Sequence, residues 1–176
     1  MRRQWGMQSD EAPPVRRRTI EWQDPMIGAA RVAEMAGIDY LQAMIDGALP
    51  PPPIISLMDM TLSSVSRGTA TFICEPNESH YNPIGAVHGG FMCTVLDSAA
   101  GCAVQTTLPA GVGYTSLEIK VNYLRAVSAT SGQLTAVGTV IKPGSRVAFA
   151  EAVITDADGR VVATASSTLL VFPIPA

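Results

Sequence analysis

Residues 89–105 constrain the fold most, because they form a helical pattern with almost no polar side. The segment follows turn residues at Asn82-Pro83 and Gly85, and opens on the pair Gly89-Gly90. A helix that is apolar on nearly every side is normally buried inside its domain. The other elements are therefore expected to surround this helix.

One charged side chain interrupts the apolar helix. Asp97 is the only Asp, Glu, Lys or Arg between Glu78 and Glu118. An isolated carboxylate in an apolar element is costly unless it is paired or used in chemistry. No Lys or Arg is close in sequence, so a functional role is favoured over an inert ion pair.

The remaining core is predicted to consist of strands. Residues 116–123 alternate, which predicts a strand whose dry face carries Leu117, Ile119, Val121 and Tyr123. Turns are expected at 142–145, with Pro143 and Gly144 in type II positions, and at 156–159. The predicted strands are 54–60, 68–74, 116–123, 134–141, 147–155 and 161–171.

Two strands, one buried helix and four further strands indicate an α+β fold. A single curved antiparallel sheet of about six strands wrapped around the helix would explain why the helix is apolar. Such a sheet leaves an exposed edge, and edges are usually managed by pairing, so a homodimer is expected.

Residues 1–49 are predicted to be an N-terminal extension, and 50–176 the core domain. Residues 1–24 are interpreted as a solvated, mobile terminus, with a phosphate or membrane contact of Arg16–Arg18 as the alternative. A helix should begin at Asp24-Pro25 and stop at Gly37, and another should cover 39–46. The proline run 50–53 should be an extended connector.

Composition narrows the classes of function. The net charge is −3 and the sequence pI about 5.3, so nucleic acid is not an expected partner. Three cysteines without CxxC spacing indicate reduced thiols in a cytoplasmic protein, and two histidines make a metal site unexpected. No apolar run is long enough to span a bilayer, and the basic N-terminus lacks the apolar stretch of a secretory signal.

Three blocks in order carry a family resemblance. They are Asn82-x-x-Gly85-x-x-His88-Gly89-Gly90 followed by Asp97, the strand 116–125, and 144–152 followed by the turn 156–159. With these blocks the chain, from about residue 50 to 171, resembles the hotdog-fold acyl-CoA thioesterases. Within them it is most similar to the phenylacetic-acid-degradation-type (PaaI-like) branch.

The resemblance implies hydrolysis of an acyl- or aryl-CoA and a role for each matching residue. Asn82 and the Gly89 N–H would bind the thioester carbonyl, and Asp97 would act on the attacking water across a dimer interface. Ser116, or in its place Thr115, would help to position that water. His88 would fix the loop and Gly90 would serve helix entry. The family commonly pairs dimers into tetramers, and needs no cofactor because coenzyme A is part of the substrate.

Coenzyme A carries phosphates, and few basic residues are available to bind them. Lys142 and Arg146 flank the turn that contains Ser145 and are the first choice, with Arg125 next. The alternative is that they are ordinary solvated turn charges. Rival functions on the same fold are a hydratase or dehydratase that uses His88 with Asp97, and a non-catalytic acyl-CoA-binding module. The acyl group, and the choice between a general base and a mixed anhydride at Asp97, stay open.

Overall fold

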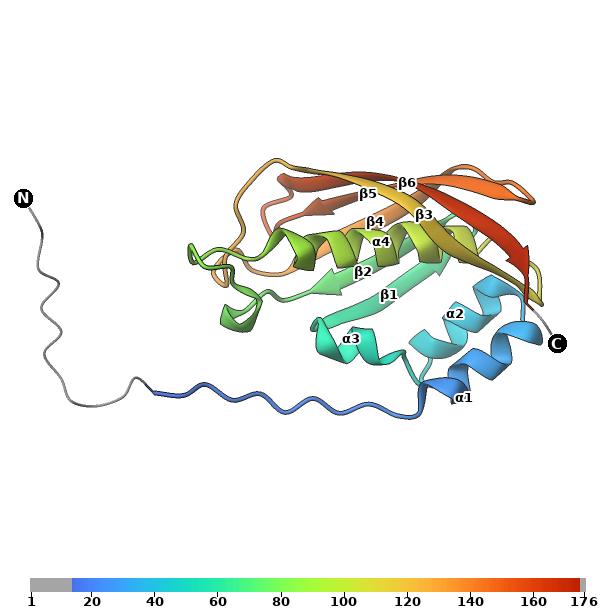
Figure 1. The fold of residues 1–176 in the computed structure, drawn as a ribbon, viewed down its shortest axis with the longest axis horizontal. Coiled ribbons are helices and arrows are strands. Elements are labelled where there is room, and N and C mark those ends of the chain that lie inside the picture. The colour runs from blue at the N-terminus through green and yellow to red at the C-terminus, as the bar shows by residue number, and fades with distance from the viewer. Residues whose placement is uncertain (1–13, 175–176) are drawn as a thin grey trace, which may run out of the picture.

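A computed structural model describes residues 14–174, and it confirms the predicted α+β architecture. One six-stranded antiparallel sheet, in the order β1-β2-β4-β5-β6-β3, curves around the long helix α4 (Gly89–Gln105) (Figure 1). Within the described range, no helix has the length and apolar character needed to cross a membrane. The strands are β1 (Met60–Ser66), β2 (Thr69–Cys74), β3 (Val112–Tyr123), β4 (Leu134–Lys142), β5 (Val147–Thr155) and β6 (Val161–Pro173).

Small residues let α4 lie unusually close to the sheet. Ala99 and Ala100 of the helix are fully buried, and they face Gly138 on β4. A Cβ built on Gly138 would lie 2.0 Å from the Ala99 carbonyl oxygen, so helix backbone and strand backbone are in direct contact. Larger side chains fill the core around this contact. The largest of these buried side chains are Phe72, Leu96, Leu134, Ile154 and Leu169.

A β-bulge at Leu117 divides β3 into two halves. Ser116 pairs with Leu169 and Glu118 with Thr168, so Leu117 is an extra residue in the β3 ladder. An extra residue reverses the alternation of faces beyond it. Ser116 before the bulge and Tyr123 after it therefore both contact α4. The predicted dry face is wrong at its two ends, because Leu117 is 58% exposed and Tyr123 51% exposed.

The N-terminal helices pack beside β1 (Figure 1). Residues 25–36 form α1 (Pro25–Ala29) and the 3₁₀ turn η1 (Ala30–Ala33), followed by α2 (Gly37–Ile45). Gly37 begins a helix and does not end one, contrary to prediction. It is needed for close approach, since a Cβ there would lie 1.8 Å from the Gln105 carbonyl oxygen.

Residues 54–57 are helical, so the predicted strand 54–60 is wrong over most of its length. The helix α3 (Pro53–Leu57) starts on the last proline of the run, and β1 begins only at Met60. Proline is favoured at the first helical position because its fixed φ suits the helix and its missing N–H is not needed there. Pro53 therefore starts a helix, and only the prolines before it form a connector.

The two predicted turns differ in outcome. The turn at 156–159 is confirmed, with Gly159 at φ 77° and its N–H donating to the Asp156 carbonyl oxygen at 2.9 Å. Gly144 does not adopt the positive φ that a type II turn requires at its position. Glycine is needed at position 144 for another reason, because a Cβ there would lie 2.1 Å from the Val147 carbonyl oxygen.

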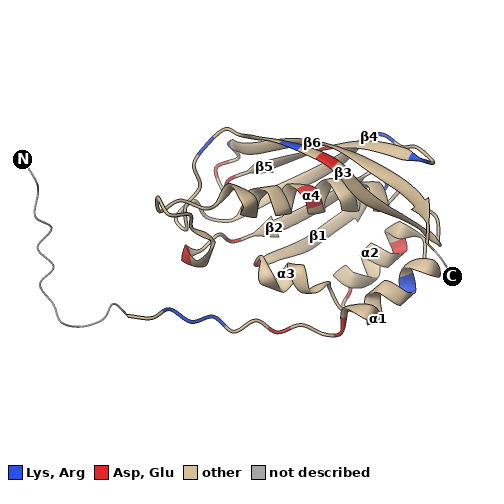
Figure 2. Cartoon of the chain, viewed as in Figure 1, with Lys and Arg blue, Asp and Glu red and all other residues tan. Residues whose placement is uncertain are grey.

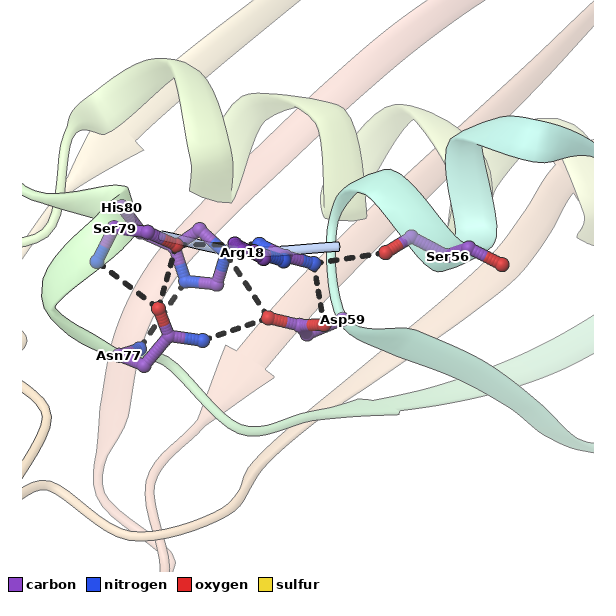
Figure 3. A network of polar contacts seen from close by, with 6 residues as sticks. All are labelled: Arg18, Ser56, Asp59, Asn77, Ser79 and His80. Atoms are coloured by element: carbon purple, nitrogen blue, oxygen red, sulfur yellow. Dashed lines mark hydrogen bonds and ion pairs between the residues drawn. The ribbon is translucent and has the colours of Figure 1, made fainter. Parts of the chain in front are cut away.

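Arg18 ties the N-terminal segment to the domain. Its guanidinium forms an ion pair with Asp59 and donates to the Ser56 carbonyl oxygen at 2.9 Å and to Ser79 Oγ at 3.2 Å (Figure 3). The Asp59 carboxylate also accepts from Asn77 Nδ2 at 2.7 Å. This part of the terminus is therefore held by specific contacts and is not simply solvated.

His80, at the end of the 3₁₀ turn η2 (Glu78–His80), belongs to the same network. Its ring stacks on Phe91 of α4 with centroids 4.2 Å apart, and its Nδ1 accepts from the Asn77 N–H at 3.2 Å. Burial lowers the pKa of His80, Asp59 opposes that shift, and Arg18 adds to it. The folded protein therefore favours the neutral ring.

This arrangement predicts a loss of stability in mild acid. The unfolded chain takes up a proton at His80 below about pH 6.5, whereas the folded chain does so only at lower pH. The contribution of neutral His80 to the stability of the fold is thus complete above about pH 6.5 and is lost as the pH falls below it. Thermal melts should show a lower midpoint at pH 5.5 than at pH 7.5, and His80→Gln should reduce the difference. An unchanged difference in His80→Gln would contradict the assignment.

Candidate active site

Asp97 and Ser116 meet between the middle of α4 and the edge strand β3. Ser116 Oγ donates a hydrogen bond to Asp97 Oδ1 at 2.7 Å. The Asp97 side chain is half-buried, and Figure 2 shows how few charges accompany it along α4. No described Lys or Arg forms an ion pair with it. The carboxylate is thus held by a hydroxyl and keeps a second oxygen free for chemistry.

One face of α4 is left uncovered by residues 14–174. Residues at helical spacing along it are half-buried or exposed: Gly90, Cys93, Thr94, Asp97 and Ser98. The helix is therefore less completely buried than its sequence predicts. This face adjoins β3, which forms an edge of the sheet.

The start of α4 supplies a backbone donor. His88 is the N-cap, and its Nδ1 accepts from the Gly90 N–H at 2.8 Å. The Gly89 N–H donates to no other described residue, as is usual for a first-turn amide of a helix. The helix dipole adds positive potential at this position, which suits an anionic oxygen.

Asn82 lies in the loop just before this helix start. Its Oδ1 accepts from the N–H groups of Ile84 and Ala86 at 3.0 and 3.2 Å, so it shapes the turn in which Gly85 has φ 81°. Its Nδ2 donates to no other described residue. Asn82 can therefore act both as a turn former and as a hydrogen-bond donor, two roles that sequence alone presents as alternatives.

Tyr123 is a neighbour of this site that sequence reasoning misses. Its hydroxyl donates to the Gly89 carbonyl oxygen at 3.0 Å, and a Cβ on Gly89 would lie 3.0 Å from its ring. Regular alternation assigns Tyr123 to the face opposite Ser116, which hides the contact. Only an irregularity at Leu117 could have revealed it.

The residues expected to bind phosphate lie elsewhere. Lys142, Ser145 and Arg146 are exposed around the β4–β5 turn, which lies near the C-terminal end of α4 beside Leu108. The 17 residues of α4 separate this turn from Gly89 by about 25 Å. Arg125 is at the other end, where its guanidinium donates to the Val161 carbonyl oxygen at 2.6 Å. Thr115 is exposed next to Ser116.

The geometry defines two functional groups along one helix. A carboxylate with a hydroxyl partner can accept a proton from water or attack a carbonyl. A free helix N-terminal N–H together with an amide side chain can stabilise negative charge on an oxygen. These are the elements required for acyl transfer to water.

Comparisons with known proteins identify the family of the chain. A profile of the thioesterase superfamily matches residues 84–163. A provisionally named esterase of Halobacterium salinarum is 31% identical over 126 residues, which cover 68% of this chain and 82% of the relative. The chain therefore belongs to the thioesterase superfamily.

Solved structures show the same hotdog fold. A provisionally named thioesterase of Ralstonia eutropha, a phenylacetic acid degradation-related protein, superposes with a TM-score of 0.68 at 26% identity and covers 74% of this chain and 98% of its own. A hypothetical thioesterase of Streptococcus pneumoniae, solved with coenzyme A, has a TM-score of 0.60 at 25% identity and covers 66% and 91%.

Proposed function

We propose that the protein is an acyl-CoA thioesterase of the phenylacetic-acid-degradation-type (PaaI-like) branch. The observation that carries the proposal is the hydrogen bond from Ser116 to Asp97 on an otherwise apolar helix. An oriented carboxylate with no ion-pair partner is suited to activating water. Superfamily membership and the coenzyme A in the S. pneumoniae structure support a coenzyme A thioester as the substrate.

In the proposed reaction, water attacks the thioester carbonyl carbon while Asp97 removes its proton. Ser116 keeps the carboxylate in place by its hydrogen bond. The Gly89 N–H and Asn82 Nδ2 stabilise the negative charge that develops on the carbonyl oxygen. The intermediate then expels the thiolate of coenzyme A, which takes up a proton. If Asp97 instead attacks the carbonyl itself, the coenzyme A thiolate is expelled as a mixed anhydride forms, and water then hydrolyses the anhydride to the free acid and restores Asp97.

The helix geometry supports a site built from two protomers. Asp97 is eight residues from Gly89, which places the two about 12 Å apart along the axis of α4. One carbonyl group cannot contact both groups of the same protomer. A second copy packed on the open face of α4 and the free edge of β3 would supply the missing half. We therefore propose an obligate homodimer, which could pair again into a tetramer.

His88 is better suited to a structural role than to catalysis. Its Nδ1 already accepts a hydrogen bond from the Gly90 N–H, which fixes the ring as the cap of α4. A hydratase or dehydratase that uses His88 with Asp97 would need the two side chains to act together. The arrangement therefore favours hydrolysis.

The direct test is release of free thiol from a panel of acyl-CoAs that includes acetyl, decanoyl and phenylacetyl thioesters. Turnover of any of them supports the proposal. The absence of turnover together with tight binding would overturn it and indicate a binding module.

Asn82→Asp separates the two roles of Asn82. The carboxylate keeps an oxygen for the Ile84 and Ala86 N–H groups, so the turn should survive, but it loses the Nδ2 donor and adds negative charge. Loss of one such donor typically lowers kcat by about a hundred- to a thousandfold. Thiol release should fall by that amount while the thermal midpoint stays near the wild-type value. Undiminished thiol release would rule out a donor role for Asn82.

A further inference from the structure

An apolar cavity of about 370 Å³ lies between the N-terminal helices and the hotdog core. The N-terminal extension contributes Met44 and Ile45 from α2, helix α3 at the start of the core domain contributes Ile55, and the sheet contributes Leu62 and Phe72. Sites for small ligands are concave spaces of about 300–1,000 Å³ that are lined mainly by apolar side chains. A space of this size with apolar walls therefore indicates a binding site.

The cavity begins close to the proposed catalytic pair. Cys102 and Tyr114 line its wall, five residues after Asp97 on α4 and two residues before Ser116 on β3. Tyr114 packs on Gly101, where a Cβ would lie 2.4 Å from its hydroxyl oxygen. Burial raises the pKa of the Cys102 thiol to about 12 and that of the Tyr114 phenol, and the nearby Asp97 carboxylate contributes to both shifts. Both wall residues thus lie within electrostatic reach of Asp97.

We propose that this cavity holds the acyl group of the substrate, that the group is a medium-length aliphatic chain, and that the N-terminal extension sets its length. The inference rests on the proposed thioesterase function, which it makes specific. A chain that leaves a carbonyl beside Asp97 and Ser116 would pass Tyr114 and Cys102 and end between α2 and α3. Residues outside the matched core of the superfamily would thereby determine specificity.

The volume of the cavity limits the length of the acyl chain that it can hold. A dry apolar cavity of about 150 Å³ holds a six-carbon ring. In proportion, 370 Å³ has room for at most about fifteen carbons. Because chains fill irregular spaces incompletely, the best fit is expected near ten carbons. An acetyl group would leave most of the cavity empty.

Binding measurements test this without requiring turnover. Thioethers of coenzyme A with S-alkyl chains of two to fourteen carbons cannot be hydrolysed, and calorimetry gives their Kd. Affinity for the wild type should rise about two- to fourfold per added methylene and level off near ten carbons. A series that is flat in chain length would overturn the inference.

Adjacent residues on α3 provide a matched pair of variants. Ile55 lines the cavity, whereas Ile54 is 39% exposed and does not. Ile55→Trp should weaken the S-decyl thioether at least tenfold and leave the S-ethyl thioether within twofold, while Ile54→Trp should change neither. Equal affinity of Ile55→Trp and wild type for the S-decyl thioether would overturn the inference.

A second variant covers the case in which Ile55→Trp does not fold. Met44→Ala enlarges the cavity, so the levelling point should move to chains about two to three carbons longer; an unmoved levelling point would overturn the inference. The two proposals can fail separately. Chain-length-dependent binding without thiol release would overturn the proposed thioesterase function and support the cavity assignment. Thiol release together with an affinity that does not depend on chain length would support the thioesterase function and overturn the cavity assignment.

Discussion

Asp97→Asn is expected to abolish most thioester hydrolysis while leaving the fold and acyl-CoA binding intact. Asn has nearly the shape of Asp, and its Oδ1 can still accept the hydrogen bond from Ser116. It cannot accept a proton from water or form an anhydride. A missing general base costs about a hundred- to ten-thousandfold in rate, and a missing nucleophile costs at least as much. The fall should appear in kcat and not in the affinity for an S-alkyl thioether.

The control is Ser98→Ala, at the next position on the same half-buried side of α4. Ser98 Oγ donates only to the Thr94 carbonyl oxygen of its own helix, at 2.9 Å. Thiol release by Ser98→Ala should stay within about twofold of the wild type, because the change removes one small hydroxyl from this face and leaves the Asp97–Ser116 pair untouched. If Asp97→Asn retained a tenth or more of the wild-type kcat, Asp97 would not be the catalytic group.

Gly138→Ala is expected to be the most destabilising glycine-to-alanine substitution in the sheet. The new Cβ would lie 2.0 Å from the Ala99 carbonyl oxygen and 2.3 Å from its carbonyl carbon. These are backbone atoms of α4 and cannot rotate away, so the helix must move off β4. Overpacking typically costs about 1–3 kcal/mol, and a backbone clash lies at or above the upper end. A loss of about 3 kcal/mol lowers the midpoint of a domain of this size by about 6–12 °C.

Gly159→Ala provides the comparison for this prediction. Gly159 has φ 77°, and a Cβ added there would meet no neighbouring atom within 4 Å, so Ala at this position meets only the cost of a positive φ, about 1 kcal/mol. Differential scanning calorimetry should therefore show a much larger shift for Gly138→Ala than for Gly159→Ala. Equal shifts would mean that α4 can move off the sheet at little cost.

Much of the fold follows from the sequence because hydrophobic pattern determines burial. The apolar segment at 89–105 becomes α4, and the later strands occur close to the predicted ranges. The same pattern fails at 54–57. Two adjacent isoleucines suit a buried strand or a helix equally well, and the position of Pro53 at a helix start decides between them only in the folded chain.

The site is less predictable than the fold, since it depends on contacts distant in sequence. Asp97 can be singled out from the sequence because it is the only charged residue in an apolar helix, and the structure places Ser116 against it. No local sequence pattern indicates that Tyr123 contacts Gly89. Gly37 looks like a helix stop because glycine often ends helices. Its actual role is to let α2 approach Gln105, a requirement that appears only after α4 and α2 have packed.

The bulge at Leu117 also affects how this strand should be compared with its relatives. Ser116 and Tyr123 are an odd number of residues apart, yet both contact α4. In a regular strand, two side chains on one face are always separated by an even number. An alignment that assumes unbroken alternation will match one half of β3 correctly and shift the other by one position. A relative whose strand has no bulge should therefore show a gap of one residue opposite Leu117. In such a relative, the residue that matches Ser116 is found by aligning the first half of the strand, and the residue that matches Tyr123 by aligning the second half.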